Sequence, residues 1–224
     1  MVYIYMKLPN FAHTAIIIGA TGSGKTYFIM DLLKTIYEDY FDIVIILCPT
    51  FSDNSTYQDN IHLFDKNKEG TRFYYYDFPE GGLSTINPKI YGRKDSTLPE
   101  VLEHFSKGFK GNEHVLFIID DLASDVETSR KHTYLSKLAI SGRHIGQYIW
   151  VLTQKYNMIC KDIRSQSMWI CSFYTKDKKS FMDMLDENDV GLTNEQKIDI
   201  RKFCKNKNKV ILKLFDNTSY ALLD

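Results

Sequence analysis

The sequence has no long apolar run and no excess of charge of either sign. No stretch of the 224 residues approaches the roughly 20 apolar residues that cross a bilayer, so we expect no membrane partner. The N-terminus does not follow the signal-peptide pattern, which predicts a soluble intracellular protein. The 28 Lys and Arg residues balance 28 Asp and Glu residues. This balance excludes a uniformly basic nucleic-acid coat protein but permits a local basic patch.

The sequence is also poor in cysteine and has no C-x-x-C pair. Its cysteines are Cys48, Cys160, Cys171 and Cys204. Neither a zinc site nor a disulfide framework is indicated, so we expect buried reduced thiols in a reducing compartment. No internal repeat and no Pro/Gly/Ser-rich linker divides the chain. We therefore predict one domain, with a core at 1–175 and a small C-terminal extension at 176–224 packed on it.

Nearly continuous apolar runs of strand length recur along the chain, at 15–19, 43–48, 115–119, 148–153 and 168–173. Runs of this kind are typical of strands covered by helices on both faces. Helical patterns fall between most of them, at 26–37, 98–109, 126–141 and, more weakly, 162–166. The alternation predicts an α/β fold with a mostly parallel sheet.

The C-terminal extension has its own pattern of elements. We expect helices at 178–187 and 194–203, the second capped by Thr193, followed by a hairpin or paired edge strands at 209–215 and 220–223. The segment 73–76 is either an additional strand or a packed loop. Its tyrosines are more typical of packing than of base stacking.

A complete phosphate-binding loop follows the first apolar run. It reads Gly19, Ala20, Thr21, Gly22, Ser23, Gly24, Lys25, Thr26 and matches G-x-x-x-x-G-K-[ST]. Glycines let successive backbone N–H groups face a phosphate, and the next helix adds a partial positive charge. Lys25 would reach the β- and γ-phosphates, and the Thr26 hydroxyl would bind Mg²⁺. The motif predicts ATP and Mg²⁺ as cofactors.

Two acids end the strand at 115–119, and a polar residue ends the strand at 148–153. Asp120 is the expected Mg²⁺ partner, acting through water, and Asp121 is placed to orient or deprotonate an attacking water. Gln154 would sense the γ-phosphate from the adjacent strand. A carboxylate aimed at water indicates hydrolysis rather than transfer to a metabolite.

Two arginines are candidates for the cation that stabilises the transition state. Arg143 precedes the strand that ends at Gln154, and Arg164 precedes the following strand. Such an arginine adds about 10³–10⁵-fold in rate. For either residue alone, a surface salt bridge is an equally good interpretation.

Taken in order, these motifs resemble the DNA-packaging ATPases of poxviruses, giant viruses and virophages, which belong to the FtsK–HerA group. The resemblance covers roughly 8–175; its most specific part is Gly142-Arg143-His144 followed by Thr153-Gln154. It implies a RecA-like P-loop NTPase fold and an ATP-driven motor. Such a motor assembles as a homo-oligomeric ring, threads double-stranded DNA into a capsid, and contacts capsid or portal proteins. It would act in the viral factory of the host cytoplasm or in the virion, with Arg143 or Arg164 working on a neighbour's ATP.

Two basic segments are candidates for gripping DNA. The first is 201–209, with five basic residues and no acid, and the second is 91–94. A solvated turn is an alternative for both. The sequence also leaves open two other functions. One is a small nucleoside or nucleotide kinase, against which the missing second Arg-rich lid argues, and the other is a binding-only NTPase relative.

Overall fold

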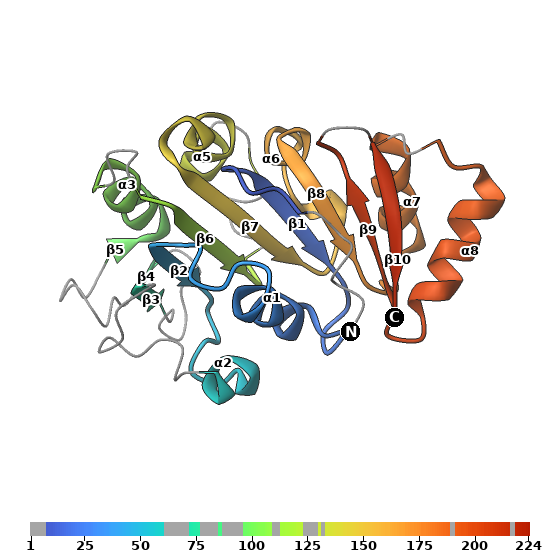
Figure 1. The fold of residues 1–224 in the computed structure, drawn as a ribbon, viewed down its shortest axis with the longest axis horizontal. Coiled ribbons are helices and arrows are strands. Elements are labelled where there is room, and N and C mark those ends of the chain that lie inside the picture. The colour runs from blue at the N-terminus through green and yellow to red at the C-terminus, as the bar shows by residue number, and fades with distance from the viewer. Residues whose placement is uncertain are drawn as a thin grey trace.

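The computed structural model describes residues 8–60, 72–76, 85–86, 96–108, 113–122, 130, 133–188, 191–215 and 218–224, and it has an α/β architecture (Figure 1). Its strands are β1 (Thr14–Ile18), β2 (Ile43–Leu47), β3 (Arg72–Tyr76), β4 (Thr85–Ile86), β5 (Ser96–Thr97), β6 (Val115–Asp120), β7 (Gln147–Thr153), β8 (Ser167–Ser172), β9 (Lys209–Lys213) and β10 (Ser219–Leu223). Its helices are α1 (Lys25–Lys34), α2 (Ser55–Asp59), α3 (Leu98–Gly108), α5 (Tyr134–Ser141), α6 (Lys161–Ser165), α7 (Lys178–Glu187) and α8 (Asn194–Cys204), with 3₁₀ turns η3 (Gly142–Ile145) and η4 (Tyr156–Met158).

One eight-stranded sheet organises the molecule, in the order β10-β9-β8-β1-β7-β6-β2-β3. The six strands from β8 to β3 are parallel, and β9 and β10 extend the sheet antiparallel to their neighbours. The carboxyl ends of the parallel strands therefore meet at one edge. In open parallel sheets this is the edge that binds ligands.

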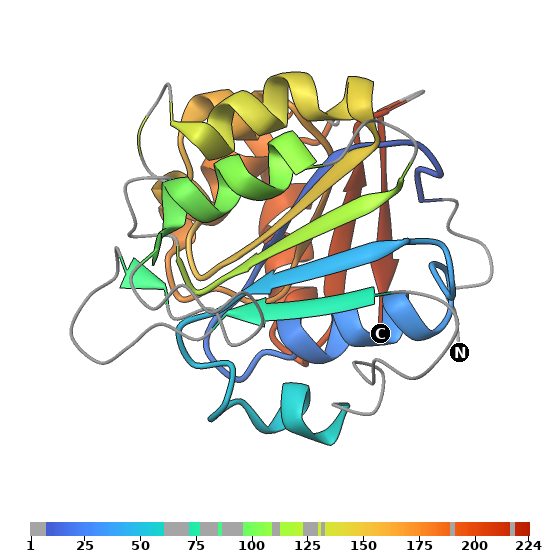
Figure 2. The ribbon, with the colours of Figure 1, turned by 90° about the vertical axis from the view of Figure 1, so that its left-hand side faces the viewer.

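Helices cover both faces of the sheet. Figure 2 shows α3 and α5 on one face and α1 on the other. Alternate residues of each strand enter different cores: Ile16 and Ile18 join the core under α3, α5 and α7, whereas Ala15 and Ile17 join the core under α1. Burial on both faces explains why the strands are continuously apolar in sequence.

The sequence predictions locate the five central strands to within one residue at each end. The segment 73–76 is a strand, β3, which pairs in parallel with β2. The predicted helix at 126–141 is wrong at its start. Arg130 lies in a bend, and Thr133 caps α5 by accepting a hydrogen bond from the Ser136 amide, so the helix begins at Tyr134. The residues between 123 and 129 are outside the described ranges.

The C-terminal elements lie where the pattern places them. Thr193 and Gln196 form a reciprocal capping box at the start of α8, and β9 and β10 form an antiparallel pair. β9 also pairs with β8, so these last strands are part of the main sheet. All four cysteines are buried and free. Within the described ranges no helix is both long and apolar enough to span a bilayer.

Candidate nucleotide site at the carboxyl edge of the sheet

The loop between β1 and α1 has the backbone conformation that its glycines permit. Gly22 and Gly24 have φ values of 72° and 97°, in the left-handed region that side chains rarely adopt. Gly24 is also the N-cap of α1, so the amide end of the helix opens onto the loop. The Gly19 amide donates to the Thr153 carbonyl (3.0 Å) and the Ala20 amide to that of Tyr174 (3.1 Å). These bonds fix the loop to the last residue of β7 and to the segment that follows β8.

Gly19 is required by close packing rather than by its torsion angles. A Cβ at this position would lie 2.4 Å from the Ser23 Oγ and 2.9 Å from the Phe173 Cβ. The Ser23 hydroxyl is buried and has no hydrogen-bond partner among the described residues. A buried hydroxyl without a partner is costly unless a ligand satisfies it. The Ser23 hydroxyl lies inside the loop, where it could donate to a phosphate oxygen.

The Lys25 side chain folds back over the loop. Its Nζ donates to the carbonyls of Gly19 (2.9 Å) and Ala20 (3.2 Å), and the residue is only 8% exposed. Burial lowers the pKa of this amine, whereas the nearby charges of Asp120 and Asp121 raise it. An ammonium has a third donor, which leaves Lys25 able to bind an anion held in the loop.

Asp120 is buried at the end of β6 and receives two side-chain hydrogen bonds. The Tyr57 hydroxyl donates to its Oδ2 at 2.8 Å, and the Thr26 hydroxyl donates to the same atom at 3.3 Å. Burial raises the pKa of the Asp120 carboxyl, while the hydrogen bond from Tyr57 lowers it and the charge of Asp121 raises it. A desolvated carboxylate beside a threonine hydroxyl is a pair of oxygen ligands of the kind that Mg²⁺ prefers.

Asp121 and Gln154 lie side by side at the exposed end of β6 and β7. The Gln154 Nε2 is 3.5 Å from the Asp121 Oδ1, at the outer limit of a hydrogen bond. Asp121 has a φ of 58°, an uncommon conformation for a residue with a side chain. Local strain of this kind is often found at functional sites. The structure therefore brings Lys25, Thr26, Asp120, Asp121 and Gln154 to one edge of the sheet.

A pocket of about 290 Å³ opens above the loop. It is lined by Gly22, Ser23, Gly24, Lys25, Thr26, Tyr27, Asn54 and Thr56. No group of three or more His, Cys, Asp or Glu side chains that could hold a metal occurs among the described residues. Mg²⁺ sites in P-loop proteins use one or two protein oxygens plus phosphate oxygens, so the pair of Thr26 and Asp120 fits that ion.

The two candidate arginines lie at the opposite edge of the sheet. β7 begins at Gln147, six residues and about 20 Å before Thr153, which pairs with Ile18 at the start of the loop. Arg143 lies in η3, immediately before β7, and is exposed. Arg164 lies in α6, before β8, where it pairs with Glu187 at 2.5 Å and its guanidinium lies over the Tyr156 ring. Neither arginine is placed to reach the loop of its own chain.

Sequence reasoning missed Tyr57, Asn54 and Thr56. Tyr57 contacts Asp120, and the other two line the pocket. All three come from the segment that carries α2, whose sequence has no apolar periodicity to place it. The only local signal is Asn54, which caps α2 by accepting from the Thr56 amide.

The basic segment at 201–209 includes an exposed turn, in which Lys205 and Lys207 are both exposed. Lys209 is 7% exposed, and Lys205 and Lys207 line a second pocket beside the phosphate loop. The other segment proposed for DNA contact, 91–94, lies outside the described residues.

Comparisons with known proteins agree with this geometry. Residues 2–69 match a family described as Poxvirus A32 protein. No curated protein matches the chain. The genome packaging NTPase B204 from Sulfolobus turreted icosahedral virus 2, in complex with AMP, has a TM-score of 0.64 at 12% identity, over 97% of this chain and 98% of that one. B204 from Sulfolobus turreted icosahedral virus, described as a DNA-packaging ATPase, has a TM-score of 0.61 at 14% identity, over 96% and 98%.

The chain is similar to viral genome-packaging NTPases. At these identities the solved structures show the fold, and the fold class predicted from the sequence is confirmed: a P-loop NTPase with a mostly parallel sheet. The family match confirms the resemblance to the poxvirus type of packaging ATPase in the part of the chain that carries the phosphate loop. The comparisons give no support to the alternative of a small nucleotide kinase.

Proposed function

We propose that the chain is an ATP-hydrolysing motor that translocates double-stranded DNA and packages a viral genome into a capsid. The proposal rests on one observation: Asp120, Asp121 and Gln154 lie beside the phosphate loop at the same edge of the sheet. The match to the Poxvirus A32 family and the fold shared with the genome packaging NTPases support packaging as the use of this ATP.

In the proposed mechanism the loop amides and Lys25 hold the β- and γ-phosphates of ATP. Thr26 and Asp120 hold Mg²⁺, which neutralises charge on the phosphates when it is bound. Asp121 orients the attacking water and accepts its proton, and Gln154 detects the γ-phosphate from the same side. The contacts between these side chains and the burial of Asp120 support these roles.

The motor acts as a homo-oligomeric ring in which one subunit completes the site of the next. Arg143 is exposed and is at the edge opposite its own loop, so in the proposed ring it would act on a neighbour's nucleotide. Two large apolar side chains close to it in sequence, Ile140 and Ile145, are 47% and 37% exposed. Apolar groups around an arginine are typical of protein interfaces. We favour Arg143 over Arg164, whose charge is already paired with Glu187.

Turnover of ATP with and without duplex DNA tests the proposal, together with a mass measurement in the presence of nucleotide. We expect hydrolysis that requires Mg²⁺, rises with duplex DNA and is lost in Lys25→Ala and Asp121→Asn. The nucleotide-loaded protein should have the mass of a ring. Hydrolysis that both substitutions leave unchanged would disprove the assignment of the site.

The same assay separates the motor from a kinase. A kinase would release ADP in proportion to a phosphorylated nucleoside or nucleotide acceptor, and duplex DNA would not stimulate it.

The location of the protein follows from the proposed function. A packaging motor meets capsid or portal proteins where capsids are filled, in the viral factory or on the particle.

A further inference from the structure

Gln154 lies just beyond the end of the sheet. β7 ends at Thr153, and Gln154 forms a solvent-exposed bend directly after it. A residue inside a sheet is held by the hydrogen bonds of the ladder, but a residue beyond the last pair depends on other contacts for its position. Groups that act on a bound ligand have to be held to within about 0.5 Å. The contacts that hold Gln154 therefore bear directly on its use.

The Gln154 carbonyl accepts a hydrogen bond from a buried hydroxyl. The donor is the Thr175 Oγ1, at 3.2 Å, and Thr175 is only 2% exposed. Thr175 lies in the segment that follows β8, and β8 is not a neighbour of β7 in the sheet, because β1 lies between them. The bond therefore passes across the end of β1, where the phosphate loop begins.

Backbone hydrogen bonds join the phosphate loop to both of these segments. The Gly19 amide donates to the Thr153 carbonyl at 3.0 Å, and the Ala20 amide donates to the Tyr174 carbonyl at 3.1 Å. The two acceptor residues come directly before the two residues that the hydroxyl bond joins. The three bonds thus close a ring through the loop, the end of β7 and the segment after β8. Only the hydroxyl bond is made by a side chain, so a substitution can remove it and leave the other two in place.

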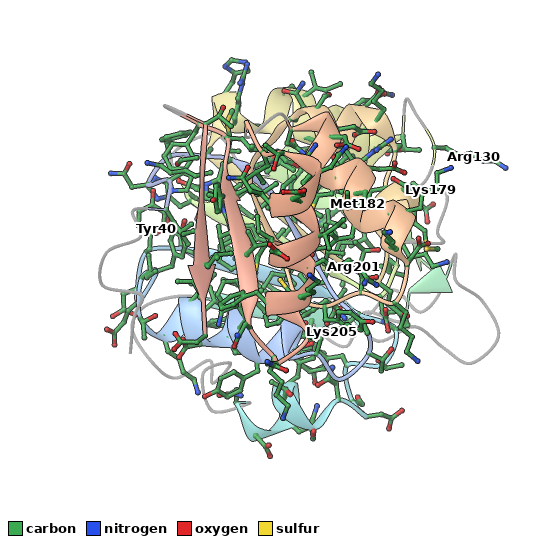
Figure 3. The ribbon with its side chains drawn as sticks, turned by 90° about the vertical axis from the view of Figure 1, so that its right-hand side faces the viewer. Tyr40, Arg130, Lys179, Met182, Arg201 and Lys205 are labelled. Atoms are coloured by element: carbon green, nitrogen blue, oxygen red, sulfur yellow. The ribbon has the colours of Figure 1, made fainter. Side chains whose placement is uncertain are left out.

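A cation from α8 holds the segment that carries Thr175. The Arg201 Nη2 donates to the carbonyls of Thr175 (3.1 Å) and Lys176 (3.4 Å). Its guanidinium also lies over the Tyr174 ring, 5.1 Å from the ring centre. Figure 3 shows Arg201 in the C-terminal half of α8. A planar guanidinium can lie over a ring while it donates to carbonyls beside that ring, and a lysine ammonium cannot replace it in both contacts.

Two further contacts support the turn after Gln154, but both are open to water. Lys155 pairs with Asp177 at 3.5 Å, and the two side chains are 53% and 32% exposed. The Asn157 Nδ2 donates to the Asp183 Oδ2 at 2.6 Å, also in an exposed position. Exposed pairs contribute little, because water competes for the same groups. The Thr175 hydroxyl is thus the buried contact of this set and the one expected to matter most.

We propose that Thr175 is a positioning residue for Gln154, and that Arg201 fixes Thr175 from the C-terminal extension. The Thr175 hydroxyl holds the Gln154 turn at a constant distance from the phosphate loop and beside Asp121. Neither Thr175 nor Arg201 is among the described residues that line the two pockets at the loop, so both act through Gln154 and not by contact with nucleotide. The inference rests on the proposed function in taking Gln154 as the residue that detects the γ-phosphate.

Two substitutions of Thr175 separate the hydroxyl from the shape of the side chain. Valine keeps the shape and removes the donor, whereas serine keeps the donor. We expect kcat for ATP hydrolysis to fall about tenfold in Thr175→Val, the equivalent of one lost hydrogen bond, and to return to within about twofold of wild type in Thr175→Ser. The affinity for AMPPCP with Mg²⁺, measured by calorimetry, should change by less than about twofold in both variants, because the loop keeps its own bonds.

A double-mutant cycle with Gln154→Ala shows whether Thr175 acts through Gln154. Once the Gln154 side chain is gone, Thr175→Val should lower kcat no further. Arg201→Lys keeps the charge but loses the planar group. It should lower kcat by about three- to tenfold in the wild-type background and not at all in the Gln154→Ala background. Single-turnover measurements with excess enzyme keep the slow rate of Gln154→Ala measurable.

Ser167→Ala and Lys197→Ala are the matched controls. The Ser167 hydroxyl also makes a buried bond to a backbone carbonyl, that of Ile163, but at the start of β8 and so at the opposite edge of the sheet. Lys197 is on α8 like Arg201, and it joins this helix to α7 through Asp186. Both variants should keep kcat and AMPPCP affinity within about twofold of wild type.

Three results would contradict the inference. Equal losses of kcat and of AMPPCP affinity in Thr175→Val would show a general disturbance of the site. Additive losses in the cycle would show an effect that does not pass through Gln154. If Gln154→Ala alone hydrolyses ATP at the wild-type rate, the role that the proposed function gives to Gln154 is wrong, and the positioning role of Thr175 is wrong with it.

Discussion

The Tyr57 hydroxyl donates a 2.8 Å hydrogen bond to the Asp120 Oδ2, across 63 residues of sequence. Tyr57 is fully buried, and its ring stacks on Phe51, whose ring stacks in turn on Tyr75 of β3. The orientation of the Asp120 carboxylate therefore depends on a segment outside the phosphate loop. Hydrogen bonds to the outer side of a metal-binding carboxylate fix its orientation and alter its affinity for the metal.

We predict that Tyr57→Phe weakens the use of Mg²⁺. The substitution retains the stacked ring but removes the donor, and loss of this hydrogen bond moves the Asp120 pKa further upward. The Mg²⁺ concentration for half-maximal ATP hydrolysis should rise by about tenfold, the lower end of the range for such supporting contacts. The measurement is a Mg²⁺ titration of ATP hydrolysis at saturating nucleotide.

Tyr37→Phe is the matched control. The Tyr37 hydroxyl also makes a buried 2.8 Å hydrogen bond, to the Pro9 carbonyl, but it lies beyond the far end of α1. Both variants should lose stability of about 1 kcal/mol, and only Tyr57→Phe should shift the Mg²⁺ dependence. If both shift it equally, the effect comes from lost stability and not from the position of Asp120.

Local sequence signals explain which features could be predicted. The central strands are continuous apolar runs because both faces of the sheet are buried, and the phosphate loop is a contiguous motif. Thr193 was recognisable as a cap because its hydroxyl bonds to a residue three positions away. Thr133 is a cap of the same type for α5, but the apolar periodicity extends N-terminal of it and therefore predicts a helix that begins too early.

Contacts between distant segments explain what could not be predicted. The sequence of α2 has no apolar periodicity from which its position could be predicted. The hydrogen bond from Tyr57 to Asp120 therefore could not be predicted either. The pairing of Arg164 with Glu187 depends on the packing of α6 near α7. The basic run at 201–209 indicates charge, but only the fold shows that Lys205 and Lys207 face the phosphate loop. The roles assigned to the site residues and the boundary at residue 175 stay predictions.

A buried histidine makes the stability of the fold depend on pH. His13 donates a hydrogen bond from Nδ1 to the Phe11 carbonyl and accepts one from the Trp150 indole at Nε2. Burial lowers the His13 pKa from 6.5 to about 4, and the bond to Phe11 opposes this only in part. The surrounding rings of Tyr37 and Tyr148 are neutral at these pH values and cannot stabilise an imidazolium by charge.

We predict that the free energy of unfolding falls as the pH drops from about 6.5 to about 4. In this window the unfolded chain binds a proton at His13 that the folded chain excludes. The stability that neutral His13 contributes is therefore fully present above pH 6.5 and is lost as the pH falls to about 4. The His13 contribution is about 3 kcal/mol. Urea unfolding at a series of pH values measures it.

His13→Gln provides the comparison. Glutamine can both donate and accept at this position, and it does not titrate. The difference in unfolding free energy between wild type and variant should shrink on acidification, since only the wild type is penalised. A constant difference from pH 7 to pH 4 would show that His13 does not contribute to the pH dependence.

The two arginines should respond differently to substitution. Arg164→Ala removes the pair with Glu187 and the contact with Tyr156, so it should lower stability by about 1 kcal/mol. Arg143 is exposed and makes no ion pair within the described ranges, so Arg143→Ala should leave stability within about 0.5 kcal/mol. If Arg143 completes a neighbour's site, its loss should reduce the rate of hydrolysis by about 10³-fold.

Mixed assemblies show whether Arg143 acts between subunits. A Lys25→Ala subunit has a defective loop but an intact arginine, and an Arg143→Ala subunit has the reverse. Placed side by side in a ring, they should form some complete sites and recover hydrolysis that neither variant has alone.

His144→Ala is the control for this experiment. His144 is an exposed neighbour of Arg143 in the same turn, and the variant should remain active without mixing. If the Arg143 mixture stays inactive while an Arg164→Ala mixture recovers activity, Arg164 is the shared residue. Both arginines lie too far from their own loop to act within one chain. If neither mixture recovers hydrolysis, neither arginine completes a neighbour's site, and the proposal of a shared site is wrong.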